Sequence, residues 1–280
     1  MNNKKLQTLY SLKWNPFSPE IPTEALWISP RLELFCSRLQ HQVREGGFAL
    51  ISGEPGSGKS AAMRLAAHRL GEVPDVVVGV VSRPQGHLAD FYRELGHLFG
   101  VPLAPHNRWA GAKCLREKWI AHLDQTLYRP LLLIDEAQEL HPPVLSELRL
   151  LASADFDSRS LLTIVLCGDS RLLAQLKTEN LLPVASRIRA RLLLETVPAR
   201  DLLDCLKHCL ERAGNPHLLT PEVMNVLCEH ALGNPRVLMQ MADDLLLAAV
   251  EREIDRIDEK LYLEVFAAPK DTRARTRTRA

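Results

Sequence analysis

The fold of this chain can be inferred from the stretch Gly53-Glu54-Pro55-Gly56-Ser57-Gly58-Lys59-Ser60. It matches the pattern G-x-x-x-x-G-K-[ST] of a phosphate-binding loop (P-loop) at every fixed position, and an apolar run at residues 47–52 leads directly into it. Glycines let backbone N–H groups curl around a chain of phosphates, while Lys59 can reach the terminal phosphates and Ser60 can hold Mg²⁺. A helix is predicted from Ala61 onward, so its positive N-terminus points at the phosphates. The sequence therefore predicts a nucleoside triphosphate site formed by residues 53–61.

A second motif supplies the carboxylates that such a site needs. Residues 131–134 form the apolar run Leu-Leu-Leu-Ile, which ends in Asp135 and Glu136. We expect Asp135 to hold the Mg²⁺ shell and Glu136 to orient and deprotonate the attacking water. In isolation the pair could be a surface feature at a strand end, but the intact P-loop favours the catalytic interpretation. The two motifs together predict hydrolysis of a Mg²⁺-bound nucleotide.

The composition is that of a globular protein. The chain has 280 residues, 46% hydrophobic and 25% charged, with a formal net charge of +1. No apolar run approaches the roughly 18 residues of a membrane span, and the basic start is not followed by an apolar segment typical of a secretory signal. The six cysteines show no C-x-x-C spacing. We therefore expect a cytoplasmic protein with no membrane partner.

The order of predicted elements indicates an α/β fold. Strands rich in Val, Ile and Leu, without alternation, are predicted at residues 47–52, 76–82, 131–134, 161–167 and 191–194. Helical stretches lie between them, so we expect a doubly wound parallel five-stranded sheet with its ligand site at the carboxyl ends of the strands. After residue 198 only helices are predicted, which indicates a small all-helical lid domain.

These patterns predict four segments. They are an N-terminal extension with the first helix at 1–45, a P-loop core at 46–197, a helical lid at 198–268 and a disordered basic tail at 269–280. Residues 1–28 contain aromatics spaced by prolines and are predicted to be too irregular for a helix. The tail alternates Arg with Thr and Ala, which favours either a solubilising terminus or contact with a phosphate backbone.

Taken together, these residues resemble the AAA+ superfamily. More narrowly, they are similar to the ExeA/GspA-type ATPases and to the TniB/TnsC regulators of DNA transposition, over about residues 8–265. The motifs that carry the resemblance are W-N-P-F at 14–17, G-G-F-A-L-I-S-G-E-P-G-S-G-K-S at 46–60, L-L-L-I-D-E-A-Q-E-L at 131–140, S-E-L-R-L-L at 146–151, I-V-L-C-G at 164–168, S-R-I-R-A-R at 186–191 and G-N-P-R at 233–236.

The resemblance implies further catalytic residues. Arg187 matches the arginine finger, which reaches the γ-phosphate of a neighbouring subunit, with Arg189 and Arg191 as alternatives. Arg236 matches the sensor-2 arginine of the lid. At the sensor-1 position the chain departs from the family, because no Asn, Thr or Ser follows the fourth strand. Asp169 is the polar residue expected there, and an acid at that point predicts slow hydrolysis.

The same resemblance implies ATP as the nucleotide. Phe17 and Ile28 precede the P-loop core, as do the residues that line the adenine pocket in relatives. Alternatively, this segment packs on the edge of the sheet for structural reasons alone. That packing is compatible with a role in the adenine pocket.

A finger acting in trans implies self-assembly into a ring or filament. The leading expectation is an assembly on double-stranded DNA that recruits or activates a DDE-type transposase. Basic residues after the second strand are the candidate DNA contacts, with a solvated helix face as the alternative: Arg83, Arg108, Lys113 and Arg116. The competing expectations are an ExeA/GspA-type secretion ATPase and a STAND-like nucleotide switch. The former would need a membrane segment and the latter sensor repeats, and neither precedes Ala280.

Overall fold

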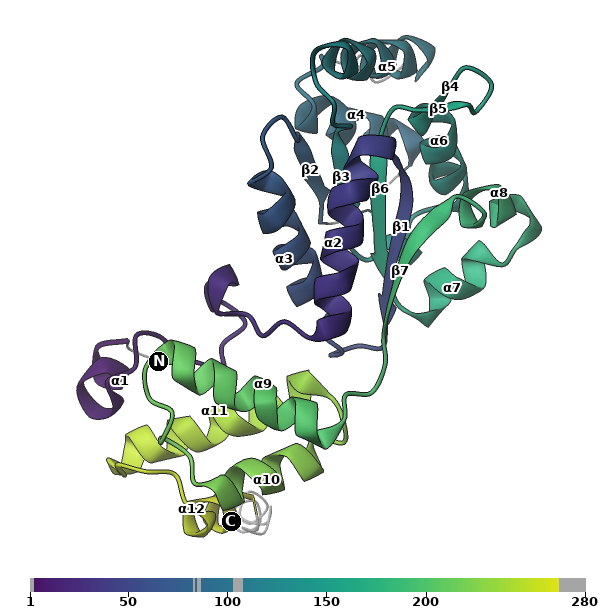
Figure 1. Ribbon diagram of the computed structural model, residues 1–280. Helices are drawn as coiled ribbons and strands as arrows, with labels where there is room; N and C mark the ends of the chain where they lie inside the picture. The colour runs from purple at the N-terminus through teal and green to yellow at the C-terminus, as the bar shows by residue number, and fades with distance from the viewer. Residues whose placement is uncertain (1–2, 83, 85–86, 103–107, 267–280) are drawn as a thin grey trace, which may run out of the picture. The chain divides into compact units, whose positions relative to one another are not determined.

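The chain forms two compact units. The computed structural model describes residues 3–82, 84, 87–102 and 108–266 (Figure 1). One unit comprises Ile28–Glu195, and the other combines Met1–Trp27 with Thr196–Ala280. Arg83 and the predicted basic tail at 269–280 lie outside the described residues.

The first unit is built on a five-stranded parallel sheet in the order β2-β3-β6-β1-β7. The strands are β1 (Gly47–Gly53), β2 (Val78–Val81), β3 (Leu131–Ile134), β6 (Thr163–Gly168) and β7 (Ile188–Leu194). All four neighbouring pairs run parallel, as predicted. β3 and β6 are buried along their whole length, which explains their continuous apolar sequences.

Helices cover both faces of this sheet, so the α/β fold class is confirmed (Figure 1). Successive strand residues point to opposite faces, and the two hydrophobic cores divide β1 accordingly. Ala49 and Ile51 pack with α2 (Pro30–Glu45) and α3 (Lys59–Gly71). Phe48 and Leu50 belong to the core on the other face. The helices of that face are α4 (Leu88–Leu98), α5 (Arg108–Gln125), α6 (Pro142–Ala152), α7 (Ser170–Leu176) and α8 (Leu182–Ala185).

A short hairpin that the sequence did not predict separates α6 from β6. Its strands are β4 (Ser153–Ala154) and β5 (Arg159–Ser160), paired antiparallel. The turn contains Asp155, Phe156 and Asp157, all with positive φ values between 51° and 68°. The strand predicted at 161–167 accordingly begins at Thr163.

The second unit is a helical bundle, and its composition corrects the predicted domain boundaries. It contains α9 (Ala199–Ala213), α10 (Pro221–His230), α11 (Pro235–Arg252) and α12 (Glu259–Phe266). It also contains α1 (Asn3–Tyr10) and the 3-10 turn η1 (Thr23–Ala25), in a region predicted to be irregular. Leu6 and Tyr10, one helical turn apart, are buried among the side chains of the C-terminal helices. Residues 3–27 therefore belong to the bundle rather than to an extension of the sheet domain.

The glycine of the G-N-P-R segment occupies a crowded turn within the helical unit. Gly233 has φ 77°, and its carbonyl accepts a hydrogen bond of 2.9 Å from the Val197 N–H. A Cβ at Gly233 would lie 2.1 Å from Thr196 Cγ2 and 2.9 Å from the Val197 carbonyl. The next residue, Asn234, caps α11 by accepting from the N–H groups of Arg236 and Val237, as predicted.

We predict that Gly233→Ala destabilises the helical unit by at least about 1–3 kcal/mol, because the new methyl group clashes and φ is positive. Urea unfolding followed by circular dichroism would measure the change. Gly71→Ala is the matched control, since a Cβ there meets no atom within 4 Å and Gly71 lies in a helix. Its expected effect is neutral or stabilising by up to about 1 kcal/mol. Equal stability of the two variants would contradict the crowding at Gly233.

Candidate nucleotide site

The P-loop joins the carboxyl end of β1 to the first turn of α3. Gly56 and Gly58 have φ values of 87° and 98°, which L-residues rarely adopt. A Cβ at Gly53 would lie 2.5 Å from Ser57 Oγ and 2.6 Å from the Leu194 carbonyl, so only glycine fits there. A Cβ at Gly58, by contrast, would meet no atom within 4 Å. The loop is therefore tight against the protein at its start and open where α3 begins.

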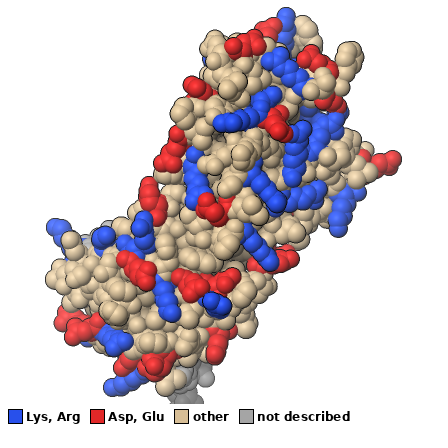
Figure 2. All heavy atoms as spheres, viewed as in Figure 1, with Lys and Arg blue, Asp and Glu red and all other residues tan. Residues whose placement is uncertain are grey.

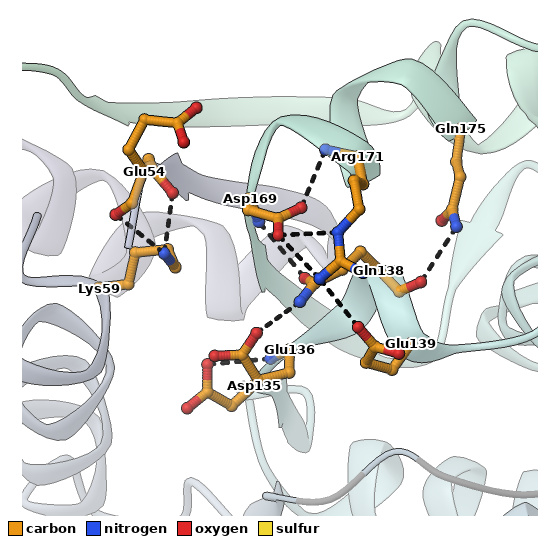
Figure 3. Close-up of polar contacts among 10 residues, drawn as sticks. Glu54, Lys59, Asp135, Glu136, Gln138, Glu139, Asp169, Arg171 and Gln175 are labelled. Atoms are coloured by element: carbon orange, nitrogen blue, oxygen red, sulfur yellow. Dashed lines mark hydrogen bonds and ion pairs between the residues drawn. The ribbon is translucent and has the colours of Figure 1, made fainter. Parts of the chain in front are cut away.

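Lys59 lies across this loop. Its side chain is 8% exposed, and Nζ donates to the carbonyls of Gly53 at 2.8 Å and Glu54 at 3.2 Å (Figure 3). An ammonium group has three donors, so these two bonds leave one for a further acceptor. Ser57 Oγ is buried and has no hydrogen-bond partner among the described residues. A loop with an unpaired hydroxyl and a spare ammonium proton suits the phosphates of a nucleotide.

The acidic pair follows β3 at the same edge of the sheet. The Asp135 N–H donates to the Val81 carbonyl at 3.0 Å, which ties the pair to the end of β2. Glu136 adopts a left-handed conformation, φ 49° and ψ 42°, and its N–H donates to Asp135 Oδ1 at 2.9 Å. Because the strands are parallel, both carboxylates lie at the edge that carries the P-loop. Ser60 and Asp135 are hard oxygen donors of the kind Mg²⁺ prefers.

A buried cysteine lies beside Asp135. Burial raises the pKa of the Cys167 thiol above its usual value, and the nearby Asp135 carboxylate raises it further. The thiol is therefore protonated at neutral pH.

Asp169, the expected sensor-1 residue, caps the helix that follows β6. Its Oδ1 accepts from the Arg171 N–H and its Oδ2 from Arg171 Nε, both at 2.9 Å. Burial alone would raise the pKa of Asp169, but the Arg171 hydrogen bonds lower it overall. Arg171 also pairs with Glu139 at 2.9 Å (Figure 3). Asp169 is thus paired with an arginine, and its sensor-1 role and the slow hydrolysis expected from it stay predictions.

Arg187 lies at the opposite edge of the sheet from the P-loop. It immediately precedes β7, whose first residue pairs with Phe48 and whose last residue pairs with Gly53. The 7 residues of β7 separate these ends by about 20 Å, at about 3.3 Å per residue. Arg187 Nη2 binds Asp157 Oδ2 at 2.5 Å, and Nη1 donates to the Pro183 carbonyl. Arg187 therefore cannot reach the P-loop of its own chain.

The other three residues predicted to contact the nucleotide are Arg236, Phe17 and Ile28. Arg236 is exposed in the first turn of α11. Phe17 is 4% exposed in the core of the helical unit, whereas Ile28 belongs to the sheet unit and packs against the core beneath α2 and α3. Phe17 thus presents little free surface to a base. The predicted nucleotide contacts of all three stay predictions.

The candidate DNA contacts are centred on α5. Lys113 lies over the ring of Trp109, 5.6 Å from its centroid, and 3.8 Å from Glu117. Trp109 is 74% exposed. Arg116 donates to the Leu150 carbonyl at 2.9 Å, which gives it a structural partner on α6. Arg108 begins α5.

A second basic region was not predicted from the sequence. Figure 2 shows basic side chains gathered on the viewed face of the sheet unit. Arg189 and Arg191 are exposed residues of β7. Burial lowers the pKa of Arg129, the positive charges of Arg159 and Arg189 lower it further, and the Glu45 carboxylate opposes them. The residues are scattered along the sequence, and only the pairing of the strands brings them together.

Comparison with known proteins defines the class. Residues 41–176, which contain both the P-loop and the Asp135–Glu136 pair, match the model of the AAA domain family. This match shows an AAA domain at residues 41–176, and the parallel sheet with its P-loop has the fold expected of one. The chain is similar to General secretion pathway protein A of Aeromonas hydrophila, with 30% identity over 253 residues that make up 89% of this chain. The chain spans 45% of the length of that relative.

Several solved structures share the fold of this chain at low sequence identity. Cdc6p from Pyrobaculum aerophilum has a TM-score of 0.67 at 15% identity, covering 91% of this chain and 72% of that one. Drosophila ORC bound to DNA gives 0.67 at 17%, covering 93% and 65%. The RuvB Holliday junction branch migration motor of Thermotoga maritima gives 0.57 at 17%, covering 90% and 72%. Among the described residues, no helix has the length and apolarity needed to cross a membrane.

We predict that Lys59→Ala weakens binding of ATP by at least about tenfold, because it removes the ammonium group at the phosphates. Titration of a fluorescent ATP analogue would measure the dissociation constant. Lys177→Ala, at an exposed position after α7, serves as the control and should leave the constant unchanged. Unchanged binding by a folded Lys59→Ala protein would contradict the phosphate site.

Proposed function

We propose that this protein is an ATPase whose active sites form between neighbouring copies of the chain. The observation that carries the proposal is the position of Arg187, about 20 Å along β7 from the strand end that meets the P-loop. An arginine at that edge can act only on a nucleotide held by another subunit. Such head-to-tail contacts generate rings or filaments.

In this proposal each chain supplies nucleotide-binding residues to one active site and an arginine finger to the active site of a neighbouring chain. Residues 53–61 bind the phosphates, and Ser60 and Asp135 hold Mg²⁺, which neutralises charge on the phosphate oxygens. Glu136 accepts a proton from the attacking water. Arg187 of the next subunit leaves Asp157 and stabilises charge on the transferred phosphoryl group. Arg236 is the proposed sensor-2 arginine. Asp169 caps the first turn of α7.

We predict that Glu136→Gln and Arg187→Ala each reduce ATP hydrolysis, the latter on the order of 10³-fold. Glu136→Gln should accumulate as an ATP-bound oligomer in size-exclusion chromatography. Mixing the two inactive variants should restore activity at roughly a quarter of the interfaces, those that join an intact Glu136 to an intact Arg187. No recovery on mixing would exclude action in trans.

The same mixing experiment shows which of Arg187, Arg189 and Arg191 acts as the arginine finger. Arg189 binds Glu45 at 2.7 Å and Arg191 donates to the Ala185 carbonyl at 3.4 Å. Arg189→Ala or Arg191→Ala should retain activity alone if Arg187 is the finger. If Arg189→Ala or Arg191→Ala is inactive alone but restores activity when mixed with Glu136→Gln, that arginine is the finger instead of Arg187.

We further propose double-stranded DNA as the surface on which the protein assembles, with recruitment of a DDE-type transposase as the consequence. The fold neighbours include a Drosophila ORC structure bound to DNA, which makes DNA a reasonable partner for this fold. The exposed Trp109–Lys113 pair and the basic region around β7 offer cations for phosphate contact.

DNA should stimulate the ATPase, and the stimulation should fall steeply between about 50 and 200 mM salt as counterions compete for the phosphates. Lys113→Ala should weaken stimulation, while Lys177→Ala should not. A coupled ATPase assay with linear duplex DNA measures both. Absence of stimulation and of DNA retention in ATP would contradict the DNA role.

A second candidate function is favoured by the likeness to General secretion pathway protein A. In that case the ATPase would serve secretion, and DNA would have no effect on its activity. Loss of the protein in its native host would then lower the export of secreted proteins.

A further inference from the structure

A buried glutamine joins the ends of two strands beside the proposed catalytic carboxylate. Gln138 is 5% exposed and lies in the 3-10 turn η2 (Ala137–Glu139) after β3. Its Nε2 donates to Glu136 Oε2, and its Oε1 accepts from the Asp169 N–H at 3.3 Å (Figure 3). Its backbone carbonyl accepts from Gln175 Nε2 at 3.0 Å. One side-chain amide therefore connects Glu136 to the carboxyl end of β6.

The end of β6 is shaped to receive this amide. A Cβ at Gly168 would lie 2.5 Å from Gln138 Oε1 and 2.9 Å from Leu172 Cδ2. The strand thus carries no side chain at this point, and the glutamine fills the space. The polar group that the sequence lacks on the strand itself is supplied by the turn after the neighbouring strand.

We propose that Gln138 is a positioning residue for ATP hydrolysis, which orients the Glu136 carboxylate and couples it to the end of β6. The inference rests on the proposed role of Glu136 as the base. In the reaction, the water oxygen forms a bond to the γ-phosphorus and the bond from that phosphorus to the bridging oxygen breaks. The water proton passes to Glu136, and ADP and phosphate leave. Gln138 neither gives nor takes a proton, but fixes one carboxylate oxygen so that the other is presented to water.

The chemistry requires an amide at this position. Only an amide can donate to a carboxylate through Nε2 while accepting a backbone N–H through Oε1. A glutamate has the same shape and can still accept from Asp169, but when ionised it has no proton to donate and repels Glu136. Glutamate therefore tests the donated bond apart from the packing.

The turn has supports that do not involve the Gln138 side chain. Arg171 pairs with both Asp169 and Glu139, each at 2.9 Å. The Glu139 N–H donates to the Glu136 carbonyl at 2.9 Å. Changes at Gln138 should therefore act on the rate of hydrolysis rather than on folding or nucleotide binding.

Steady-state kinetics of Gln138→Glu and Gln138→Ala test the proposal. We expect kcat to fall by about 10- to 100-fold, with KM and ATP affinity within about twofold of wild type, because orientation of the base is lost while the P-loop is intact. Gln40→Glu, the same chemical change at an exposed position on α2, is the control and should leave kcat unchanged. Wild-type kcat in folded Gln138→Glu would overturn the proposal. Parallel losses of kcat, ATP affinity and melting temperature would overturn it too, since they indicate a structural role.

A double-mutant cycle with Gly168 gives an independent test. Gly168→Ala should displace the Gln138 amide and lower kcat by itself, but should cause little further loss in a Gln138→Ala background. Additive losses would contradict coupling through the amide. Failure of the underlying ATPase proposal would look different, because Glu136→Gln would then retain hydrolysis. Loss of activity in Glu136→Gln with full activity in Gln138→Glu would reject only the positioning role.

Discussion

The parallel pairing of β1 with both β6 and β7 is the constraint on which the rest of the sheet unit depends. β1 is buried on both faces, and Ala49 pairs with Val165 on one side and Ala190 on the other. Because all strands run the same way, every loop after a strand lies at one edge and every loop before a strand lies at the other. The P-loop, Asp135 and Asp169 all lie at the edge where the loops follow the strands.

The same constraint places Arg187 at the second edge. In the proposed mechanism, strand direction rather than any contact near the nucleotide is what would make the site dependent on another subunit. A sheet with β7 reversed would place Arg187 beside the P-loop of its own chain. The proposed division of catalysis between subunits is thus a property of topology.

Much of the fold follows from local sequence. The apolar strand runs, the Ser29 and Thr220 caps with their following prolines, and the P-loop glycines all act through neighbouring residues, so their positions are predictable. The packing of the N-terminal segment from α1 to Phe17 on the C-terminal helices is not predictable, because it joins segments about 200 residues apart. Leu6 and Tyr10 of α1 are buried in one hydrophobic cluster with side chains of the C-terminal helices. The single sequence contains no sign of that partnership.

The site shows the same division. Lys59, Asp135 and Glu136 stand in motifs whose spacing is fixed by one loop or one strand end, and the sequence alone identifies them. Gln138 also stands in a motif, D-E-A-Q, but its contact with the Asp169 backbone depends on β3 pairing with β6. A bare glycine at the end of β6 was the available signal, because a missing side chain leaves space for another. Arg189 and Arg191 stand in the motif S-R-I-R-A-R, but nothing in the sequence links them to the distant Arg129 and Arg159.

The Asp157–Arg187 pair has a consequence for the energetics of assembly. An arginine that already has a carboxylate partner does not gain a whole ionic interaction when it meets a phosphate; it exchanges one for another. The net free energy of that exchange depends on how much more negative the phosphate is than the carboxylate. A triphosphate presents more charge at this point than a diphosphate, so the two nucleotides differ most where the exchange takes place. The strength of the Asp157–Arg187 pair would thereby affect how strongly assembly prefers the triphosphate over the diphosphate.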